Sequence, residues 1–139
     1  MNPSVTAGDD VNAIRRLGEE FFAGVATADL DRRMATMDPD AIIMPPDRPS
    51  IVGAQEIRRR SHDYAAVFQE ECSVVYDEVE TVGHWGFVRA TVTGIRTYKS
   101  GGAIENVNLK NLWIVKRRTD GQWKFWRIMF NSTSLDPNA

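Results

Sequence analysis

The chain has 139 residues, of which 42% are hydrophobic and 26% charged, and its formal net charge is -2. This size and composition are typical of a single globular domain, and the small net charge argues against a surface that binds nucleic acid or an anionic membrane. The single cysteine, Cys72, excludes an intramolecular disulfide and a cysteine-based zinc site.

We expect neither a secretory signal peptide nor a membrane helix. Residues 1–10 lack the basic and then apolar run of a signal peptide. No apolar stretch approaches the roughly 20 residues that a membrane helix needs. We therefore expect a cytoplasmic protein that does not enter a membrane. We also expect one domain over residues 9–133, between flexible tails at 1–8 and 134–139.

The first part of the chain is predicted to be helical. After Asp9 or Asp10 as N-cap, apolar residues recur at the three- and four-residue spacing of an amphipathic helix, at Val11, Ile14, Leu17, Phe21 and Val25. Asp29 then caps a short second helix over residues 30–37, which the Asp38-Pro39 turn ends. Two helices therefore precede any strand.

A short strand over residues 40–44 comes next, and Pro45-Pro46 ends it because proline has no N–H to donate to a strand ladder. A third helix begins near Gly53, with Ile57, Ser61, Tyr64 and Phe68 as its inner stripe. Four strands follow, at 73–82, 86–98, 105–117 and 122–131. The last two form a hairpin, because Asp120-Gly121 suits a tight turn.

The last strand has two apolar faces. Strict alternation places Trp126, Ile128 and Phe130 on one face, and Trp123, Phe125, Arg127, Met129 and Asn131 on the other. A strand with one wet face should instead alternate apolar and polar residues. We therefore expect one face to lie under the helices and the other to pack against a second surface, such as another subunit.

Five short motifs occur in an order that resembles the nuclear transport factor 2-like superfamily, in particular its SnoaL-like and ketosteroid-isomerase-like branch. They are Ala-Asp-Leu-Asp at 28–31, Asp-Ala-Ile-Ile-Met-Pro-Pro at 40–46, Gly-Ala-Gln-Glu-Ile-Arg at 53–58, Trp-Gly-Phe-Val-Arg at 85–89 and Asp-Gly-Gln-Trp-Lys at 120–124. The resemblance implies an α+β fold, in which a cone-shaped, curved antiparallel sheet packs on three N-terminal helices as a cystatin-like α+β barrel. It also implies a pocket at the open end of the cone and a homodimer through the outer sheet face.

The resemblance does not extend to the catalytic residues of ketosteroid isomerases. Those enzymes use an aspartate base on the first strand, with a tyrosine and a protonated aspartate as oxyanion donors. The corresponding positions here hold Pro45, Phe21 and Trp113, or Asn111 in place of Trp113 if the hairpin register slips. These side chains cannot move a proton as required. We can place neither the histidines of scytalone-dehydratase-like enzymes nor the Asp-Arg-Asp relay of limonene-epoxide-hydrolase-like enzymes, and the last-strand aspartate of many SnoaL-like relatives is replaced by Ile128.

A mostly apolar ligand pocket is the expected site. On the resemblance its lining is Phe21, Pro45, Tyr64, Arg89, Asn111, Trp113, Trp126 and Ile128, with Arg60 or Ser61 on the third helix. An inward guanidinium at Arg89 must pair with Glu105 or another carboxylate, or receive a ligand carboxylate or enolate. Asn111 and Tyr64 are either ligand hydrogen-bond donors or structural residues. The two tryptophans form either an aromatic wall or simple core. No metal or cofactor is expected, because the two histidines and Cys72 are far apart in the sequence.

Two functions fit these features. The first is a small-molecule-binding protein, such as an isomerase, cyclase or lyase that acts on an apolar or aromatic carbonyl compound, with Arg89, Asn111 and Tyr64 as polar anchors. The second is a non-catalytic dimeric protein-interaction module of the same fold, in which the cone is filled. An open cavity lined by Arg89 and Asn111 would favour the first function. A cone plugged by Trp113 and Trp126 would favour the second.

Overall fold

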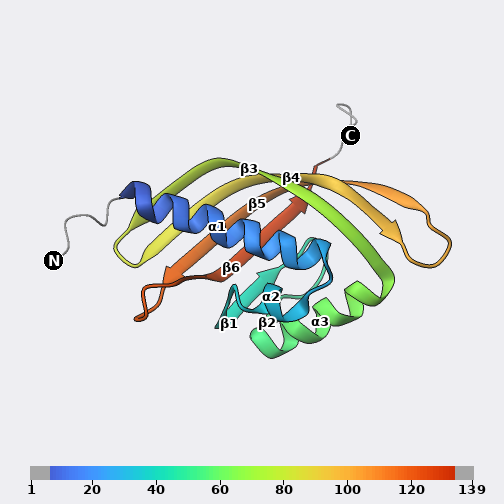
Figure 1. Cartoon of the computed structure of the whole chain (residues 1–139), viewed down its shortest axis with the longest axis horizontal. Helices are drawn as coiled ribbons and strands as arrows, with labels where there is room; N and C mark the ends of the chain where they lie inside the picture. Colours follow the sequence, from blue (N-terminus) through green and yellow to red (C-terminus); the bar gives the residue numbers. More distant parts are fainter. Residues whose placement is uncertain (1–6, 134–139) are drawn as a thin grey trace.

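The computed structural model describes residues 7–133, which form a curved, unclosed sheet with helices on its concave side (Figure 1). Residues 1–6 and 134–139, which belong to the predicted tails, lie outside the described residues. The helices lie in the first half of the chain, with two short strands before the third helix, and four long strands form the second half. The predicted α+β class is confirmed.

The helices are α1 (Ala7–Ala26), α2 (Leu30–Met34) and α3 (Ala54–Val67). α2 begins where predicted, because the Asp29 side chain accepts a hydrogen bond from the backbone N–H of Arg32 at 3.0 Å. Its predicted end was wrong. α2 stops at Met34, and Asp38 and Pro39 already belong to a strand. Asp38 is buried there, and its Oδ2 accepts a hydrogen bond from Arg118 Nη1 at 2.7 Å.

The sheet has six strands in the order β2-β1-β6-β5-β4-β3. They are β1 (Met37–Met44), β2 (Ile51–Val52), β3 (Phe68–Val82), β4 (Trp85–Tyr98), β5 (Ile104–Arg117) and β6 (Trp123–Ser132). Neighbouring strands are antiparallel except β1 and β6, which are parallel. The predicted hairpin of the last two strands is confirmed. Two details were not predicted: the short strand β2, and the start of β3 at Phe68 rather than at residue 73.

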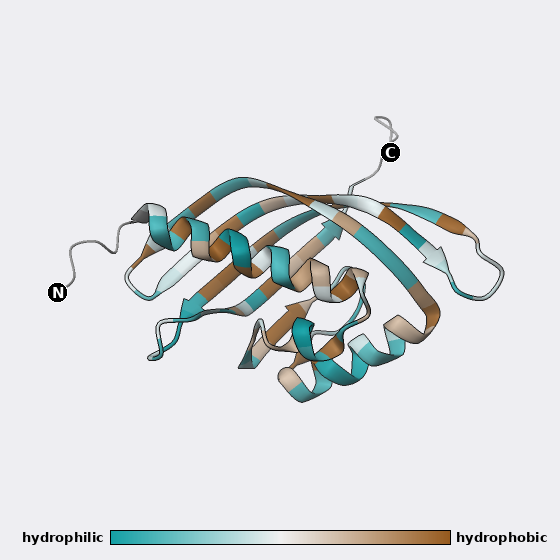
Figure 2. Cartoon of the chain, in the orientation of Figure 1, coloured by the Kyte–Doolittle hydropathy of each residue, from teal (hydrophilic) through white to brown (hydrophobic). Residues whose placement is uncertain are grey.

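The core lies between α1 and the concave face of the sheet. Ile14, Leu17 and Phe21 of α1 pack there against alternate residues of the strands, including Val88, Ala90, Trp113 and Val115. Bands of apolar and polar residues alternate along the long strands (Figure 2). This alternation assigns one face of each strand to the core and the other to the outer surface.

A β-bulge at Trp126 changes which residues of β6 face the core. Ile114 pairs with Arg127 and Val115 pairs with Phe125, so Trp126 is an extra residue between these pairs. Phe125 before the bulge and Ile128 after it are therefore both buried. The prediction that Trp126 faces inward and Phe125 outward was wrong, because it assumed unbroken alternation. Trp126 instead stacks edge-on against Trp85, with ring centroids 5.0 Å apart.

Gly94 permits the close approach of β3 to β4. A Cβ atom at this position would lie 2.0 Å from the backbone oxygen of Glu71 and 2.8 Å from Cα of Cys72. Any side chain would therefore force the two strands apart. Aromatic rings connect α3 with the start of β3 and the end of β4. The ring centroids of Tyr64 and Phe68 are 4.8 Å apart, and those of Phe68 and Tyr98 are 4.6 Å apart.

Candidate ligand site

Two of the residues predicted to line the pocket lie on the outer surface of the sheet. Trp126 is one, because of the bulge. Arg89 is the other, since its neighbours Val88 and Ala90 occupy the core side of β4. The Arg89 guanidinium pairs with Glu78 at 2.7 Å and lies 3.9 Å from Asp77. The prediction that Arg89 faces the interior was therefore wrong, and its partner is not Glu105.

The remaining predicted pocket residues lie on the inner side. Phe21, Asn111, Trp113 and Ile128 are buried. Tyr64 is half-buried, and so is Pro45, which follows β1. Asn111 and Trp113 are two residues apart on β5, so both side chains point inward in the one register that the hairpin adopts.

The orientation of the Asn111 amide is set by Trp113. The indole Nε1–H donates a hydrogen bond to Asn111 Oδ1 at 3.0 Å. Because an indole nitrogen only donates, the amide oxygen must face it and the Nδ2 group points away. Nδ2 is buried and makes no hydrogen bond to any described residue.

A cavity of about 90 Å³ lies where α1 ends, beside α2, α3 and the start of β3. Its apolar wall includes Val25, Leu30, Ala65 and Phe68, and its polar groups belong to Arg33, Ser61, His62, Tyr64 and Glu70. Of the predicted pocket residues, Tyr64 lines this cavity, and so does Ser61, which was considered together with Arg60. Neither of the two expected arrangements is present: Arg89 and Asn111 do not line this cavity, and Trp113, but not Trp126, fills the interior.

Arg33 is the most unusual group at this cavity. Its Nε atom is buried and has no hydrogen-bond partner in the described part of the chain. The guanidinium carbon lies 4.8 Å from the centroid of the Phe21 ring. Burial lowers the pKa of Arg33, while the nearby Glu70 and Tyr64 act in the opposite direction. Glu70 is close enough to influence this charge, but it forms no ion pair with Arg33.

The sequence analysis did not single out Arg33, which follows Arg32 on the short helix α2. The two side chains lie on different sides of α2. Arg32 forms an exposed ion pair with Glu20 at 2.8 Å, whereas Arg33 shares the inner side with Leu30, three residues earlier. Gly24 allows α1 to lie against this part of α2, because a Cβ at Gly24 would be 2.8 Å from the backbone nitrogen of Arg33.

A network of polar side chains extends from the cavity across the sheet. The Tyr64 hydroxyl donates to Glu70 Oε1 at 3.0 Å and accepts from Arg96 Nη1 at 3.1 Å. Arg96 Nη2 binds Glu105 Oε2 at 2.6 Å, and the Tyr98 hydroxyl donates to Glu105 Oε1 at 2.6 Å. The sequence analysis missed Glu70 because the predicted strand began after it.

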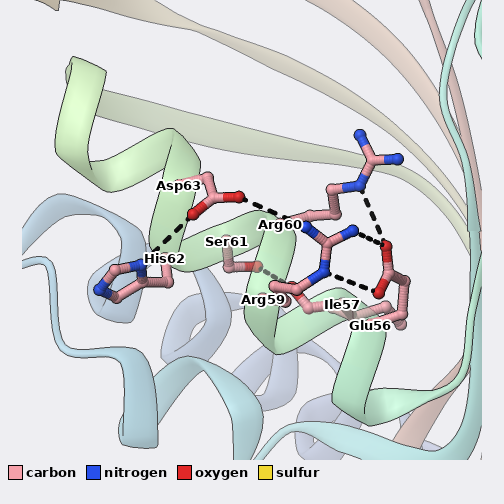
Figure 3. Close-up of polar contacts among 7 residues, drawn as sticks. All are labelled: Glu56, Ile57, Arg59, Arg60, Ser61, His62 and Asp63. Carbon is pink, nitrogen blue, oxygen red and sulfur yellow. Dashed lines mark hydrogen bonds and ion pairs between the residues drawn. The ribbon is translucent and has the colours of Figure 1, made fainter.

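The exposed side of α3 is an ion-pair surface rather than part of the site (Figure 3). Glu56 binds Arg59 and Arg60, and Arg59 reaches Asp63 at 3.7 Å. Arg60 is therefore outside the pocket. The buried Ser61 hydroxyl donates to the backbone oxygen of Ile57 at 2.7 Å, one turn earlier (Figure 3). Ser61 thus contributes to the cavity wall with its hydrogen bond already made.

The site contains groups suited to acid–base and carbonyl chemistry. Within residues 7–133, no three His, Cys, Asp or Glu side chains are grouped so that they could hold a metal ion. Arg33 and Tyr64 can donate hydrogen bonds, and Glu70 can accept a hydrogen bond or a proton.

None of the described helices is long and apolar enough to cross a membrane.

Comparison with known proteins gives a family and a fold. The SnoaL-like domain matches residues 19–126 of the chain. A ketosteroid isomerase-like protein from Erwinia carotovora atroseptica superposes with a TM-score of 0.82 and 23% identity, over 90% of this chain and 97% of the other. No curated protein matches the sequence.

Two further solved structures come from Novosphingobium aromaticivorans. A candidate scytalone dehydratase has a TM-score of 0.83 and 17% identity, over 90% of this chain and 85% of the other. A candidate aromatic ring hydroxylase has a TM-score of 0.79 and 24% identity, over 93% of this chain and 91% of the other. At these identities the likeness extends to the fold alone.

Proposed function

Because the chain belongs to the SnoaL-like domain family, we propose that it binds a small molecule in the cavity between α1, α2, α3 and β3, and that Arg33 holds an oxygen atom of this ligand. The fold is one whose solved relatives include a protein named as a candidate scytalone dehydratase and one named as a candidate aromatic ring hydroxylase.

The orphaned Nε–H of Arg33 is the observation that carries this proposal. A buried donor without a partner costs roughly 1–3 kcal/mol of stability, and more when the group is charged. Arg33 bears that cost beside a cavity large enough for a small ligand. A ligand oxygen at hydrogen-bond distance from Nε would remove the penalty, so the site is better satisfied when it is occupied.

Proton transfer on a carbonyl compound is the reaction that these groups would support. A carbonyl oxygen bound to Arg33 would be polarised by the guanidinium, and Glu70 lines the same cavity as a carboxylate able to accept a proton. Tyr64 keeps its proton, since burial raises its pKa to about 12. We therefore infer an isomerase, cyclase or lyase in which Arg33 anchors the ligand in place of Arg89 and Glu70 acts as the base.

A thermal-shift screen of small carbonyl compounds tests the binding site. We expect compounds that raise the melting temperature of the wild type to lose this effect in Arg33→Met and to keep it in Arg32→Met, because ligand binding stabilises by mass action. Arg32→Met is the matched control, since it removes the neighbouring arginine from the exposed side of α2. Compounds that stabilise Arg33→Met as well as the wild type would contradict the proposal.

A second proposal concerns the outer face of the sheet. Trp85, Phe87, Leu112 and Met129 are 41–47% exposed there, and Trp126 lies against Trp85. Leu112 lies opposite Met129 on β6 and diagonal to Phe87 on β4, so these side chains form one apolar patch, with Arg89 beside Leu112. We propose that a second copy of the chain covers this patch to form a homodimer. A protein-interaction module without catalysis is the alternative function that this patch supports.

A further inference from the structure

The hydrogen bond between Tyr64 and Glu70 has a defined direction. Arginine can only donate, so the Tyr64 oxygen must be the acceptor in its contact with Arg96 Nη1. The one hydroxyl proton of Tyr64 therefore points to Glu70 Oε1. The raised pKa of Tyr64, which burial causes, keeps this proton in place at neutral pH.

The hydrogen-bond network that orients Tyr64 and Glu70 is anchored on the sheet. Arg96 donates from Nε and Nη2 to Glu105 Oε2, at 3.1 and 2.6 Å, and its guanidinium lies 4.9 Å from the Phe68 ring centroid. Glu105 is held from its other oxygen by Tyr98. The side chains that orient Glu70 thus come from α3, β4 and β5, which fixes the carboxylate relative to the cavity.

Two hydrogen-bonding groups of residues that line the cavity have no partner among residues 7–133. Arg33 Nε is an unused donor. Glu70 lines the cavity, and its Oε2 forms no hydrogen bond or ion pair with residues 7–133, while Oε1 is occupied by Tyr64. A complementary ligand would therefore carry an acceptor for the guanidinium and a donor for the carboxylate.

We propose that the ligand is an uncharged carbonyl compound with an N–H or O–H group beside the carbonyl, as in a primary amide or an α-hydroxyketone. The carbonyl oxygen accepts from Arg33 Nε, and the adjacent donor binds Glu70 Oε2. A carboxylate would satisfy Arg33, but it would bring a second negative charge beside Glu70. This inference rests on the proposed function, because it assigns the ligand class of the same cavity.

The test uses a matched pair of small probes, isobutyramide and isobutyrate, at pH 7. They have similar shapes and differ in charge and in the N–H donor. Binding is followed by the ¹⁵N–¹H resonance of Arg33 Nε, assigned by its loss in Arg33→Met. We expect the amide to bind the wild type at least about tenfold more tightly than the acid.

Glu70→Gln removes the charge and supplies an N–H donor. We therefore expect the ratio of the dissociation constants of the two probes to shift by about tenfold in favour of isobutyrate. Glu71→Gln is the control, because this neighbouring side chain is exposed on the outer side of β3 and should leave the order unchanged. The wild-type comparison alone decides the matter if Glu70→Gln does not fold.

The outcomes separate the two proposals. Tighter binding of isobutyrate to the wild type would overturn the inferred ligand class and leave the cavity as a binding site. Equal effects of Glu70→Gln and Glu71→Gln would also overturn it. If neither probe shifts the Arg33 Nε resonance, the proposed function of the cavity fails, and the inference fails with it.

Discussion

Arg33 is placed where function and stability have opposite requirements. Its buried, unpartnered Nε–H should cost stability, while its stem packs beside Phe21. We expect Arg33→Met to leave the free energy of unfolding unchanged or to raise it by about 1 kcal/mol, because methionine fills similar space without a charge. Urea denaturation measures this change. A large loss of stability would mean that the guanidinium has a structural role.

Cys72 illustrates how the concave face controls reactivity. Burial raises the pKa of this thiol from 9.0 to about 12, and the nearby Glu70 acts in the same direction. The thiolate is the reactive form, so at pH 8 we expect alkylation by iodoacetamide to be at least about a hundredfold slower than in the urea-unfolded chain. The rate should rise steadily with pH toward 12. Rapid labelling of the folded protein at pH 8 would contradict this environment.

At the level of the elements, the bulge in β6 makes a prediction that strict alternation does not. Phe125 is 1% exposed and contacts Phe21 and Trp113, so we expect Phe125→Ala to cost about 3–5 kcal/mol. Trp126 is the larger residue, but it lies on the outer side against Trp85 and Arg127. We expect Trp126→Ala to cost less than about 2 kcal/mol in urea denaturation. The opposite order would mean that alternation continues through residue 126.

At the level of the whole molecule, the outer apolar patch predicts the assembly. Leu112 lies between Arg89 and Met129 in the sheet and is 47% exposed. We expect the wild type to have the mass of a dimer by light scattering at micromolar concentration, and Leu112→Glu to have the mass of a monomer, because a charge would be desolvated in the interface. Val67→Glu, equally exposed on α3, is the control. A monomeric wild type would remove the basis for the dimer.

Features that depend on neighbouring residues could be predicted from the sequence. The apolar spacing in α1, the Asp29 cap of α2 and the Asp120-Gly121 turn are local signals, and each is found in the structure. The order of these elements was enough for the fold. The domain limits and the dimer stay predictions.

The site could not be predicted in the same way, because its residues are brought together by packing. Arg33, Tyr64 and Glu70 come from α2, α3 and β3, and the network that orients Glu70 ends on β5. Which face each strand residue occupies depends on register, so one bulge reverses Phe125 and Trp126, and Arg89 turns outward with its strand. The sequence by itself determined the elements and their order, since these follow from local periodicity and turn chemistry. Only the tertiary structure decided which charged side chains line the cavity, since burial and hydrogen bonding across distant segments exist only in the folded chain.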